Sequence, residues 1–366
     1  MNQEKSSALI IESVEIWPID IKMTDDFTIS KGKITTAENL FVRVKLAGGA
    51  IGYGEIAPFT DITGEDRTTS QKVAKELGAL LVGQSAGSYR KLSDLMLEAH
   101  PAQPAARCGL ETAILDAFCH ALDIPLWAFW GGSNIKPHET DITIPILDFE
   151  RSVELAGEWF TKGFRVFKIK VGSKIEQDIA KIREISRLYP EVSLVLDANQ
   201  GFSEKESMDF LEEVQRMKCN ILLFEQPVPK DDLMRMAQIR KATRIPIAAD
   251  ESVSTAQEAL AVIRAGAADI INIKIMKSGV IEALKIAAIA RAAGIKLMLG
   301  GMVETRLAMS CSLAIAIGIG GVDILDLDTP LLLSEDPLEG GYRYAGPTMS
   351  VWSEPGLGMR PISFPT

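Results

Sequence analysis

Two different patterns of hydrophobic and polar residues follow one another along the chain. In the first part, runs that alternate between apolar and polar residues are followed by amphipathic stretches with helical spacing. Strands are expected at residues 9–21, 39–47 and 50–57, and helices near 67–83, 88–98 and 104–122. Gly48-Gly49 is typical of a hairpin turn between the second and third strands. Strands followed by helices in this order predict a compact α+β domain.

The second pattern is a repeat of short β-branched runs, each followed by an amphipathic or alanine-rich stretch of helical character. The runs end near Ile146, Lys170, Asp197, Glu225, Asp250, Lys274, Gly300 and Asp326. These ends are 24 to 28 residues apart, the length that a parallel strand, a helix and two loops require. Eight strands with seven intervening helices predict an α/β fold, a (β/α)7β modified TIM barrel. A doubly wound open sheet is the competing architecture, but no glycine-rich dinucleotide loop follows the first strand.

These patterns divide the chain into two domains. We predict that residues 1–130 form an N-terminal α+β capping domain and that residues 131–336 form the barrel, with the polar stretch 131–140 at the boundary. Residues 337–366 lack the strand–helix rhythm, so we expect them to return to the capping domain.

Charged residues occupy the predicted carboxyl ends of the barrel strands, where the active sites of such barrels lie. Asp197, Glu225 and Asp250 end the third, fourth and fifth strands. Adjacent parallel strands lie about 4.8 Å apart, so three acids there would repel one another unless a cation neutralised them. An all-oxygen site without histidine or cysteine suits Mg²⁺ or Mn²⁺. Asn199, expected on the same strand face as Asp197, is a candidate hydrogen-bond donor to this metal site.

Three lysines accompany these acids. Lys168 and Lys170 share a face of the second strand, and the crowding of their ammonium groups is expected to lower the pKa of each. Lys274 ends the sixth strand, which lies opposite the second in an eight-stranded ring. Bases on opposite faces of one carbon atom can invert it, because one removes a proton and the other returns one, and a metal stabilises the enolate formed in between. In the alternative interpretation, Lys170 and Lys274 serve only as counter-ions of the carboxylates.

Asp326 and Asp328 share a face at the end of the eighth strand, across the predicted barrel mouth from the metal site. A pair of acids favours binding of an ammonium group. A substrate whose carboxylate binds the metal and whose amine reaches these acids is a zwitterion, such as a short peptide. In the alternative interpretation, the two acids cap the next segment or pair with a neighbouring base.

The composition narrows the class of protein. With 47% hydrophobic and 24% charged residues, the chain has the profile of a globular protein. The net charge of −10 argues against nucleic acid or an anionic membrane as the main partner. The first residues lack the apolar core of a secretion signal and the four cysteines are scattered, so we expect a cytoplasmic protein with reduced thiols. We expect a small-molecule partner and assembly into a homo-oligomer.

The set Lys168-x-Lys170, Asp197, Glu225, Asp250 and Lys274 resembles the enolase superfamily, specifically its muconate-lactonizing subgroup. The resemblance covers nearly the whole chain, from the capping domain through the barrel to the C-terminal return. Asp326-Leu327-Asp328, followed by Thr329-Pro330, is similar to the Asp-x-Asp element of dipeptide epimerases such as the L-Ala-D/L-Glu epimerases.

The resemblance implies an activity and a role for each residue. It implies an isomerase that epimerises dipeptides of the L-Ala-X type by 1,1-proton transfer at the α-carbon of the C-terminal residue. Lys170 and Lys274 would be the acid/base catalysts, and Lys168 an auxiliary cation in the substrate site. Asp326 and Asp328 would hold the amino terminus of the substrate. The Mg²⁺ ligands that it implies are Asp197, Glu225 and Asp250.

One loop departs from the pattern of the L-Ala-D/L-Glu epimerases. These enzymes carry an arginine in a mobile loop of the cap, where it pairs with the glutamate side chain of the substrate. Here Gly32 aligns with that arginine and is flanked by Lys31 and Lys33. Either a neighbouring lysine replaces the arginine, or the preferred C-terminal residue is not glutamate. Phe59 and Ile62, in a second cap loop, are expected to be apolar contacts of the substrate.

Other reactions of the same subgroup use the same lysines and metal. They are o-succinylbenzoate synthesis, N-acylamino acid racemisation and muconate cycloisomerisation. Their substrates lack a free amine, so Asp326 and Asp328 would be misplaced against an anion. A non-catalytic barrel that serves as a binding or scaffold protein is the remaining alternative.

Overall fold

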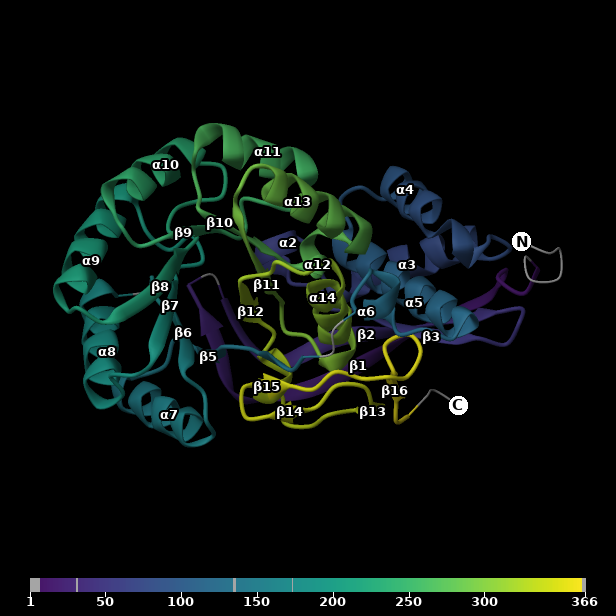
Figure 1. The fold of residues 1–366 in the computed structure, drawn as a ribbon, viewed down its shortest axis with the longest axis horizontal. Helices are drawn as coiled ribbons and strands as arrows, with labels where there is room; N and C mark the ends of the chain where they lie inside the picture. Colours follow the sequence, from purple (N-terminus) through teal and green to yellow (C-terminus); the bar gives the residue numbers. More distant parts are fainter. Residues whose placement is uncertain (1–6, 31, 134–135, 173, 364–366) are drawn as a thin grey trace.

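The computed structural model describes residues 7–30, 32–133, 136–172 and 174–363. An antiparallel sheet in the order β1 (Ile11–Ile29), β2 (Gly32–Leu46) and β3 (Ile51–Ile56) forms one layer of the cap. The first two strands are longer than expected, because pairing resumes after a register shift between Lys22 and Phe27 and continues to Ile29 opposite Gly32. Polar residues 24–26 interrupt the alternation there, which is why the predicted strand ended at residue 21. The extension carries the tip of this sheet to the barrel (Figure 1).

The central helix of the cap is α5 (Pro104–Leu122), which is buried on nearly all sides. It packs across β3, where Gly52 and Gly54 are required because a Cβ atom on either would collide with the backbone of α5. Two further helices, α3 (Arg67–Leu81) and α4 (Tyr89–Ala99), begin and end close to the predicted positions. Short helical turns are α2 (Thr60–Thr63), η1 (Ala86–Ser88), α6 (Leu126–Phe129) and η2 (Thr329–Leu332). None of the helices described here is both long enough and apolar enough to cross a lipid bilayer.

Among the residues that the structure describes, eight parallel strands alternate with helices around a barrel, which confirms the predicted (β/α)7β fold (Figure 1). The strands, which follow one another in chain order, are β5 (Ile142–Ile144), β6 (Val166–Lys170), β7 (Ser193–Asp197), β8 (Asn220–Glu225), β9 (Ile247–Ala249), β10 (Ile270–Ile273), β11 (Lys296–Gly300) and β12 (Ile324–Asp326). The helices between them are α7 (Phe149–Thr161), α8 (Ile175–Leu188), α9 (Glu204–Arg216), α10 (Leu233–Ala242), α11 (Ala256–Ala265), α13 (Val280–Ala292) and α14 (Arg306–Ile319). The short helix α12 (Ile275–Ser278), directly after β10, was not predicted.

Inward side chains form layers inside the barrel. The lower layer is an apolar cluster of Val195, Leu223, Ala248, Ile270 and Met298. Because strand side chains alternate, the residues two positions later face the same interior one layer nearer the carboxyl ends. Those residues are Asp197, Glu225, Asp250, Asn272 and Gly300. The apolar layer therefore closes the barrel below a polar layer that faces the cap.

The barrel closes between β12 and β5, where a side chain replaces a backbone partner. Asp141 N–H donates to Leu325 O (3.1 Å) in ordinary backbone pairing. Two residues later, Thr143 N–H donates instead to Asp328 Oδ2 (2.5 Å). Asp328 thus satisfies a buried backbone donor that would otherwise lack a partner at the junction of the strands.

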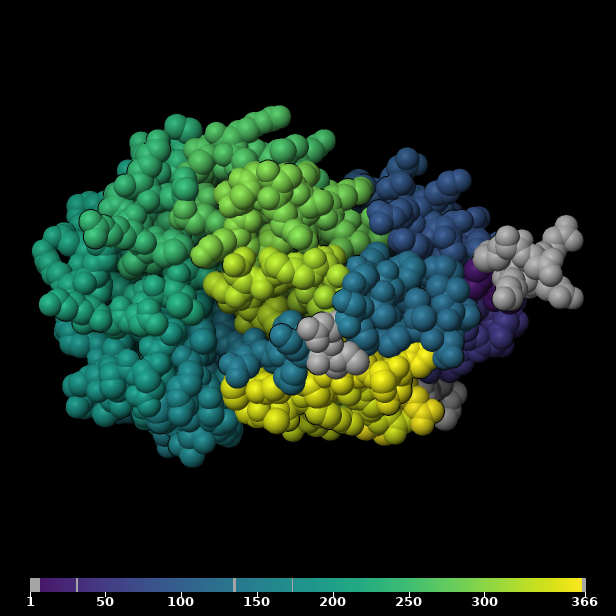
Figure 2. Space-filling view, in the orientation of Figure 1, coloured from purple at the N-terminus to yellow at the C-terminus, as the bar shows by residue number. Residues whose placement is uncertain are grey.

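The C-terminal residues contact both parts of the molecule. Figure 2 shows them (yellow) along the barrel and along the region of α5 (blue). They form the strands β13 (Leu338–Gly340), which pairs with β16 (Met359–Pro361), and β14 (Tyr344–Ala345), which pairs with β15 (Thr348–Met349) next to β4 (His138–Glu139). Leu357 N–H donates to Asp116 Oδ1 of α5 (2.7 Å). The domain boundaries near residues 130 and 336 stay a prediction.

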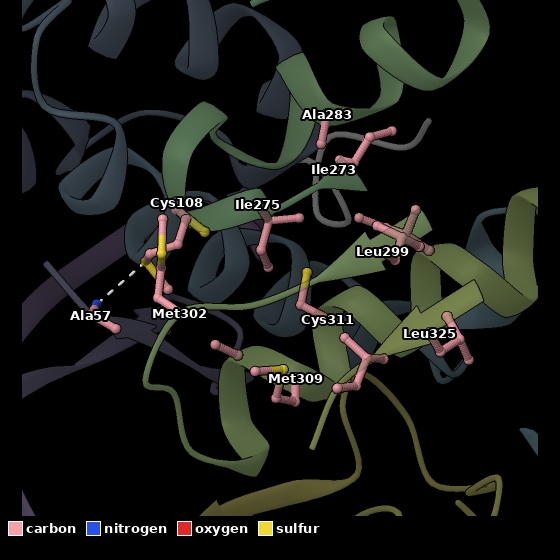
Figure 3. Close-up of a cluster of buried hydrophobic side chains, with 14 of the residues drawn as sticks. Ala57, Cys108, Ile273, Ile275, Ala283, Leu299, Met302, Met309, Cys311 and Leu325 are labelled. Atoms are coloured by element: carbon pink, nitrogen blue, oxygen red, sulfur yellow. Dashed lines mark hydrogen bonds between the residues drawn. The ribbon is translucent and has the colours of Figure 1, made fainter. Parts of the chain in front are cut away.

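A sulfur-rich apolar core joins the cap to the barrel. Figure 3 shows Cys108 of α5, Ile275 of α12 and Cys311 of α14 in one buried cluster. Ala57 N–H donates to Met276 Sδ in the same region (3.3 Å). All four cysteines are free within the described chain, as expected for reduced thiols. Separating the cap from the barrel would expose this core, so the two parts are held together by apolar burial.

Asp116 is expected to make the stability of the protein depend on pH. Its carboxylate is fully buried and accepts hydrogen bonds from Tyr53 N–H (2.8 Å) and Leu357 N–H (2.7 Å). Burial raises the pKa of Asp116 to about 7. This pKa is therefore higher in the folded than in the unfolded state. The protonated carboxyl group stabilises the fold fully at pH values below its unfolded-state pKa, and this stabilisation is lost as pH rises through about 7.

Through Asp116 alone, the free energy of unfolding is expected to fall by about 2 kcal/mol between roughly pH 5 and pH 7. Urea denaturation of wild type and of Asp116→Asn at several pH values measures this, and the variant should show the smaller pH dependence. The same pH dependence in both proteins would contradict the prediction.

Candidate active site

A cavity lies between the carboxyl ends of the barrel strands and the tip of the cap. From the barrel it is lined by Thr143, Lys168, Lys170, Asn199, Lys274, Gly301, Met302, Val303, Asp326 and Thr329, and from the cap by Phe27, Ile29, Phe59 and Ile62. The extended end of β1 is fixed over the barrel, because Ile146 N–H donates to Thr28 O (2.9 Å) and Ser30 Oγ donates to Ala198 O (2.9 Å). The cap therefore supplies one wall of the cavity and the barrel supplies its charged floor.

Asp197, Glu225 and Asp250 come together at the ends of β7, β8 and β9. Asp197 and Glu225 are partners in the register of β7 and β8, and Asp250 follows β9 directly. All three side chains are buried, and each offers an oxygen within 4.8 Å of the other two. The sequence had placed the three acids on adjacent strands, and the structure turns all of them inward.

Lys170 and Lys274 approach these acids from opposite sides. Lys170 ends β6, and Lys274 follows β10, four positions away in the strand order. Lys170 Nζ lies 2.7 Å from Asp197 Oδ2, and Lys274 Nζ lies 2.7 Å from Asp250 Oδ2. Burial by itself lowers the pKa of Lys274, but the carboxylates of Asp250, Glu225 and Asp326 together outweigh burial and raise this pKa. Both lysines are counter-ions of the acids and also line the cavity, so one role does not exclude the other.

Lys168 is the most deeply buried of the three lysines, with 1% of its surface exposed. Its Nζ lies 2.7 Å from Asp326 Oδ2 and 2.9 Å from Glu225 Oε2. Asp197 Oδ2 is a third neighbour at 3.1 Å. The expectation that Lys170 would lower the pKa of Lys168 is wrong, because the surrounding carboxylates outweigh burial and raise it well above its usual value. Lys168 is thus a fixed cation at the centre of the site.

The pKa values of Asp197 and Glu225 are shifted in opposite directions. At Asp197 burial favours the neutral form, but Lys170 and Lys168 outweigh it and lower the pKa to about 2. Burial raises the pKa of Glu225 to about 8, and the neighbouring charge of Asp197 adds to this effect. Glu225 is therefore the acid whose ionisation would gain most from a further cation.

Asn199 does not contact the acids in the expected way. β7 ends at Asp197, and Asn199 has a left-handed backbone conformation with φ 42°, so strand alternation no longer applies. Its backbone N–H, rather than its side chain, donates to Asp197 Oδ1 (2.9 Å). The side-chain Nδ2 donates to Glu251 Oε1 (3.3 Å), and the side chain lines the cavity.

Two buried side chains that contact the acids were missed by the sequence reasoning. Lys277 of α12 donates to Asp250 Oδ1 (2.6 Å), and burial lowers its pKa although Asp250 opposes this. Asn272 Nδ2 donates to Glu225 Oε1 (2.7 Å). The spacing of both residues from Lys274 could have predicted that they lie near the acids. Asn272 precedes Lys274 by two residues on one strand face, and Lys277 follows it by one turn of a helix.

Asp326 and Asp328 have different surroundings. Asp326 ends β12, lines the cavity and pairs with Lys168. Asp328 lies beyond the strand end and is fully buried. Its Oδ2 accepts from Thr143 N–H, and it does not contribute to the described lining of the cavity. Each acid offers an oxygen within 4.8 Å of an oxygen of the other. Their partners differ because the strand, and with it the alternation of side chains, ends at Asp326.

Asp141 is a third acid in this group and was not predicted. One of its oxygens lies within 4.8 Å of oxygens of Asp326 and Asp328. Its carboxylate is buried, and neither oxygen has a hydrogen-bond partner among the described residues. Burial, strengthened by the charge of Asp326, raises the pKa of Asp141 well above its usual value. Its position directly before β5 and two residues before Thr143, which lines the cavity, was the available signal.

Two family models match the chain. Residues 13–131 match the N-terminal domain of mandelate racemase/muconate lactonizing enzymes, and residues 151–362 match the enolase C-terminal domain-like family. The chain belongs to the mandelate racemase/muconate lactonizing enzyme family. The resemblance to the enolase superfamily found in the sequence is thereby confirmed.

Members of the mandelate racemase/muconate lactonizing enzyme family that are similar to this chain include dipeptide epimerases. The aromatic dipeptide epimerase of Herpetosiphon aurantiacus is 39% identical over 350 residues, which are 95% of this chain and 98% of that protein. The L-Ala-D/L-Glu epimerase of Bacillus subtilis is 35% identical over 350 residues, 94% of this chain and 95% of that protein. The solved structure of the Cytophaga hutchinsonii dipeptide epimerase, complexed with Mg and D-Ala-L-Val, is 33% identical and has a TM-score of 0.93 over 96% of each chain. The similarity therefore extends over cap, barrel and C-terminal segment.

Proposed function

We propose that this protein is an isomerase, a Mg²⁺-dependent epimerase of dipeptides of the L-Ala-X type. It would invert the α-carbon of the C-terminal residue by 1,1-proton transfer. The observation that carries the proposal is the pair Lys170 and Lys274, which reach one cavity from opposite strands beside three converging carboxylates. Its similarity to dipeptide epimerases over nearly the whole chain supports the same conclusion.

Asp197, Glu225 and Asp250 fit a hard divalent cation. Their carboxylate oxygens converge within 4.8 Å, and oxygen donors of this kind suit Mg²⁺, with Mn²⁺ as the substitute. Glu225, whose pKa burial raises to about 8, is the carboxylate that needs such a charge most. When bound, the cation would stabilise the negative charge that grows on the substrate carboxylate as the α-proton leaves.

Lys170 and Lys274 would act as the two bases. The α-carbon of the substrate would lie between their Nζ atoms, so that one lysine removes the proton from one face and the other protonates the opposite face of the enolate. Burial lowers the pKa of Lys274, but the nearby carboxylates, Asp250 foremost, together raise it, so Lys274 would become a better base if a bound cation engaged those carboxylates. Lys168, held protonated by the acids around it, would attract the substrate carboxylate.

Asp326 favours a substrate with a free amine. It is a carboxylate in the cavity lining, and Asp141 and Asp328 beside it add negative potential. The substrates of o-succinylbenzoate synthases, N-acylamino acid racemases and muconate cycloisomerases offer no amine to pair with it. We therefore favour dipeptide epimerisation over these reactions. Assembly into a homo-oligomer and a cytoplasmic location stay predictions.

Solvent-deuterium exchange into a dipeptide library, with Mg²⁺ present and mass-spectrometric detection, tests this function. Label is expected at the α-carbon of the C-terminal residue of L-Ala-X dipeptides, and removal of Mg²⁺ with a chelator should abolish it. Faster exchange into N-acylated amino acids than into free dipeptides would favour the alternative reactions. Exchange into no carboxylate substrate would contradict an enzymatic function and favour a scaffold protein.

A further inference from the structure

Apolar side chains from the cap and from the segment after β11 also line the cavity, and we call them the apolar wall. They are Phe27, Ile29, Phe59, Ile62, Met302 and Val303. Phe27 and Ile29 share one face of β1, Phe59 and Ile62 belong to the segment around α2, and the other two follow β11. Residues distant in the sequence thus supply the apolar lining of the cavity that Lys170 and Lys274 also line.

Buried hydrogen bonds hold this wall in place. Asn39 Nδ2 donates to Val303 O (2.9 Å) and to Glu55 Oε1 (2.8 Å). Glu55 also accepts from Thr305 N–H (2.9 Å), and its carboxylate is fully buried. These hydrogen bonds fix the segment that follows β11 to the cap sheet. The position of Val303 in the apolar wall is therefore set by buried contacts.

The wall carries no described cation that could pair with an acidic side chain of a substrate. Gly32 has no side chain, and a Cβ atom there would collide with the carboxylate of Asp61. Lys33 Nζ pairs with Asp26 Oδ2 (2.5 Å), and both side chains are more than half exposed. Lys33 lines a neighbouring cavity that shares Phe59 and Val303 with this one, but it does not line this cavity itself. Lys31 lies outside the described residues. Of the two possibilities left open by the sequence, the described residues favour a C-terminal residue other than glutamate.

In the proposed function, the charged groups of the cavity all interact with main-chain groups of the dipeptide. Lys168 attracts the substrate carboxylate, Lys170 and Lys274 face the α-carbon, and Asp326 faces the amine. The side chain on that α-carbon is left to the apolar wall. Burying a charged or polar group there without a partner is unfavourable, whereas burying an apolar group is favourable.

Resting on the proposed epimerase function, we propose that the cavity selects dipeptides with an apolar C-terminal side chain, such as phenylalanine, leucine or methionine. Values of kcat/KM for epimerisation of L-Ala-L-Phe, L-Ala-L-Leu, L-Ala-L-Ala, L-Ala-L-Glu and L-Ala-L-Lys by the Mg²⁺-loaded wild-type protein test it. We expect the phenylalanine and leucine dipeptides to exceed the glutamate and lysine dipeptides by about 100-fold. Comparable or higher values for glutamate or lysine would overturn the selection while leaving the epimerase function in place. Turnover of no dipeptide would instead overturn the proposed function itself.

Two variants test which residues of the apolar wall determine the preference for the C-terminal side chain of the substrate. Phe59→Ala is expected to lower kcat/KM for L-Ala-L-Phe about tenfold or more, mainly through KM, and to change the value for L-Ala-L-Ala less than about threefold. Ile62→Arg should raise the ratio of L-Ala-L-Glu to L-Ala-L-Phe turnover about 30-fold or more, because it supplies the missing cation. Met234→Ala, on the outer helix α10 where Met234 is 70% exposed, is the matched control and should change neither ratio. Equal losses for the phenylalanine and alanine dipeptides in Phe59→Ala would show a general effect on the fold and overturn the assignment of that wall.

Discussion

Replacing Lys274 or Lys170 with alanine is expected to abolish epimerisation and to leave one half of the reaction measurable. Each variant lacks the base on one face of the α-carbon, so the overall rate should fall about 10⁴-fold. The remaining lysine can still exchange the α-proton of one epimer with solvent. The two variants should therefore exchange opposite epimers, since the lysines stand on strands four positions apart in the barrel. Deuterium incorporation into separately supplied L,L and L,D dipeptides measures this by nuclear magnetic resonance.

The charge-conserving variants Lys170→Arg and Lys274→Arg are the controls, because both lysines also neutralise the acids of the site. They retain the cation next to Asp197 and Asp250 but lack a base of suitable pKa. They should bind Mg²⁺ and still fail to epimerise. Exchange of the same epimer by both alanine variants would contradict the two-base arrangement.

Asp326→Asn is expected to lower kcat/KM for a free dipeptide about 10²- to 10³-fold, because the ammonium group of the substrate loses its anionic partner. Asp328→Asn is the matched control. Its side-chain oxygen can still accept from Thr143 N–H, and Asp328 does not contribute to the described lining of the cavity, so the loss should stay within about tenfold. The structure thus predicts different losses of activity for the two variants, although the Asp-x-Asp motif contains both acids.

The ratio of free to N-acetylated dipeptide turnover distinguishes recognition of the amine from an indirect effect. Asp326 also pairs with Lys168 at 2.7 Å, and its removal alters the charge around that lysine. If Asp326 recognises the amine, the variant should lose activity with the free dipeptide and change little with the acetylated one. An equal loss with both substrates would show that Asp326 acts through Lys168.

Much of the barrel was predictable because its signals are local. A run of β-branched residues and an amphipathic helix each follow from short-range periodicity, and their regular spacing predicts a parallel barrel. Alternation along a strand then places Lys168 and Lys170 on one face and Asp197 and Glu225 on neighbouring inward positions. The same reasoning fails where a strand ends, as at Asn199, because a residue with a left-handed backbone no longer follows the alternation.

Long-range contacts decided the rest. The extension of β1 to Ile29 is an exception, because it is a local hairpin in which Ile29 lies opposite Gly32 of β2, after polar residues that interrupt the alternation. The pairing of Lys277 with Asp250 depends on elements that meet only in the folded chain. The same holds for Asp141, whose carboxylate has no hydrogen-bond partner among the residues that the structure describes. The raised pKa of Lys168 has the same origin, since its carboxylate neighbours come from β7, β8 and β12.

The sequence by itself determined the architecture of the barrel and the identity and order of the charged residues at its strand ends, because both depend on periodicity along the chain. Only the tertiary structure decided which residues of the cap cover those charges and how the acids and lysines pair. The contacts of the cap join segments that are more than 100 residues apart, such as Asn39 and Val303, whose Nδ2 and O atoms are 2.9 Å apart. The acid–lysine pairs join side chains of different barrel strands, such as Lys170 Nζ and Asp197 Oδ2 at 2.7 Å. Periodicity carries no information about such distances, and packing sets them.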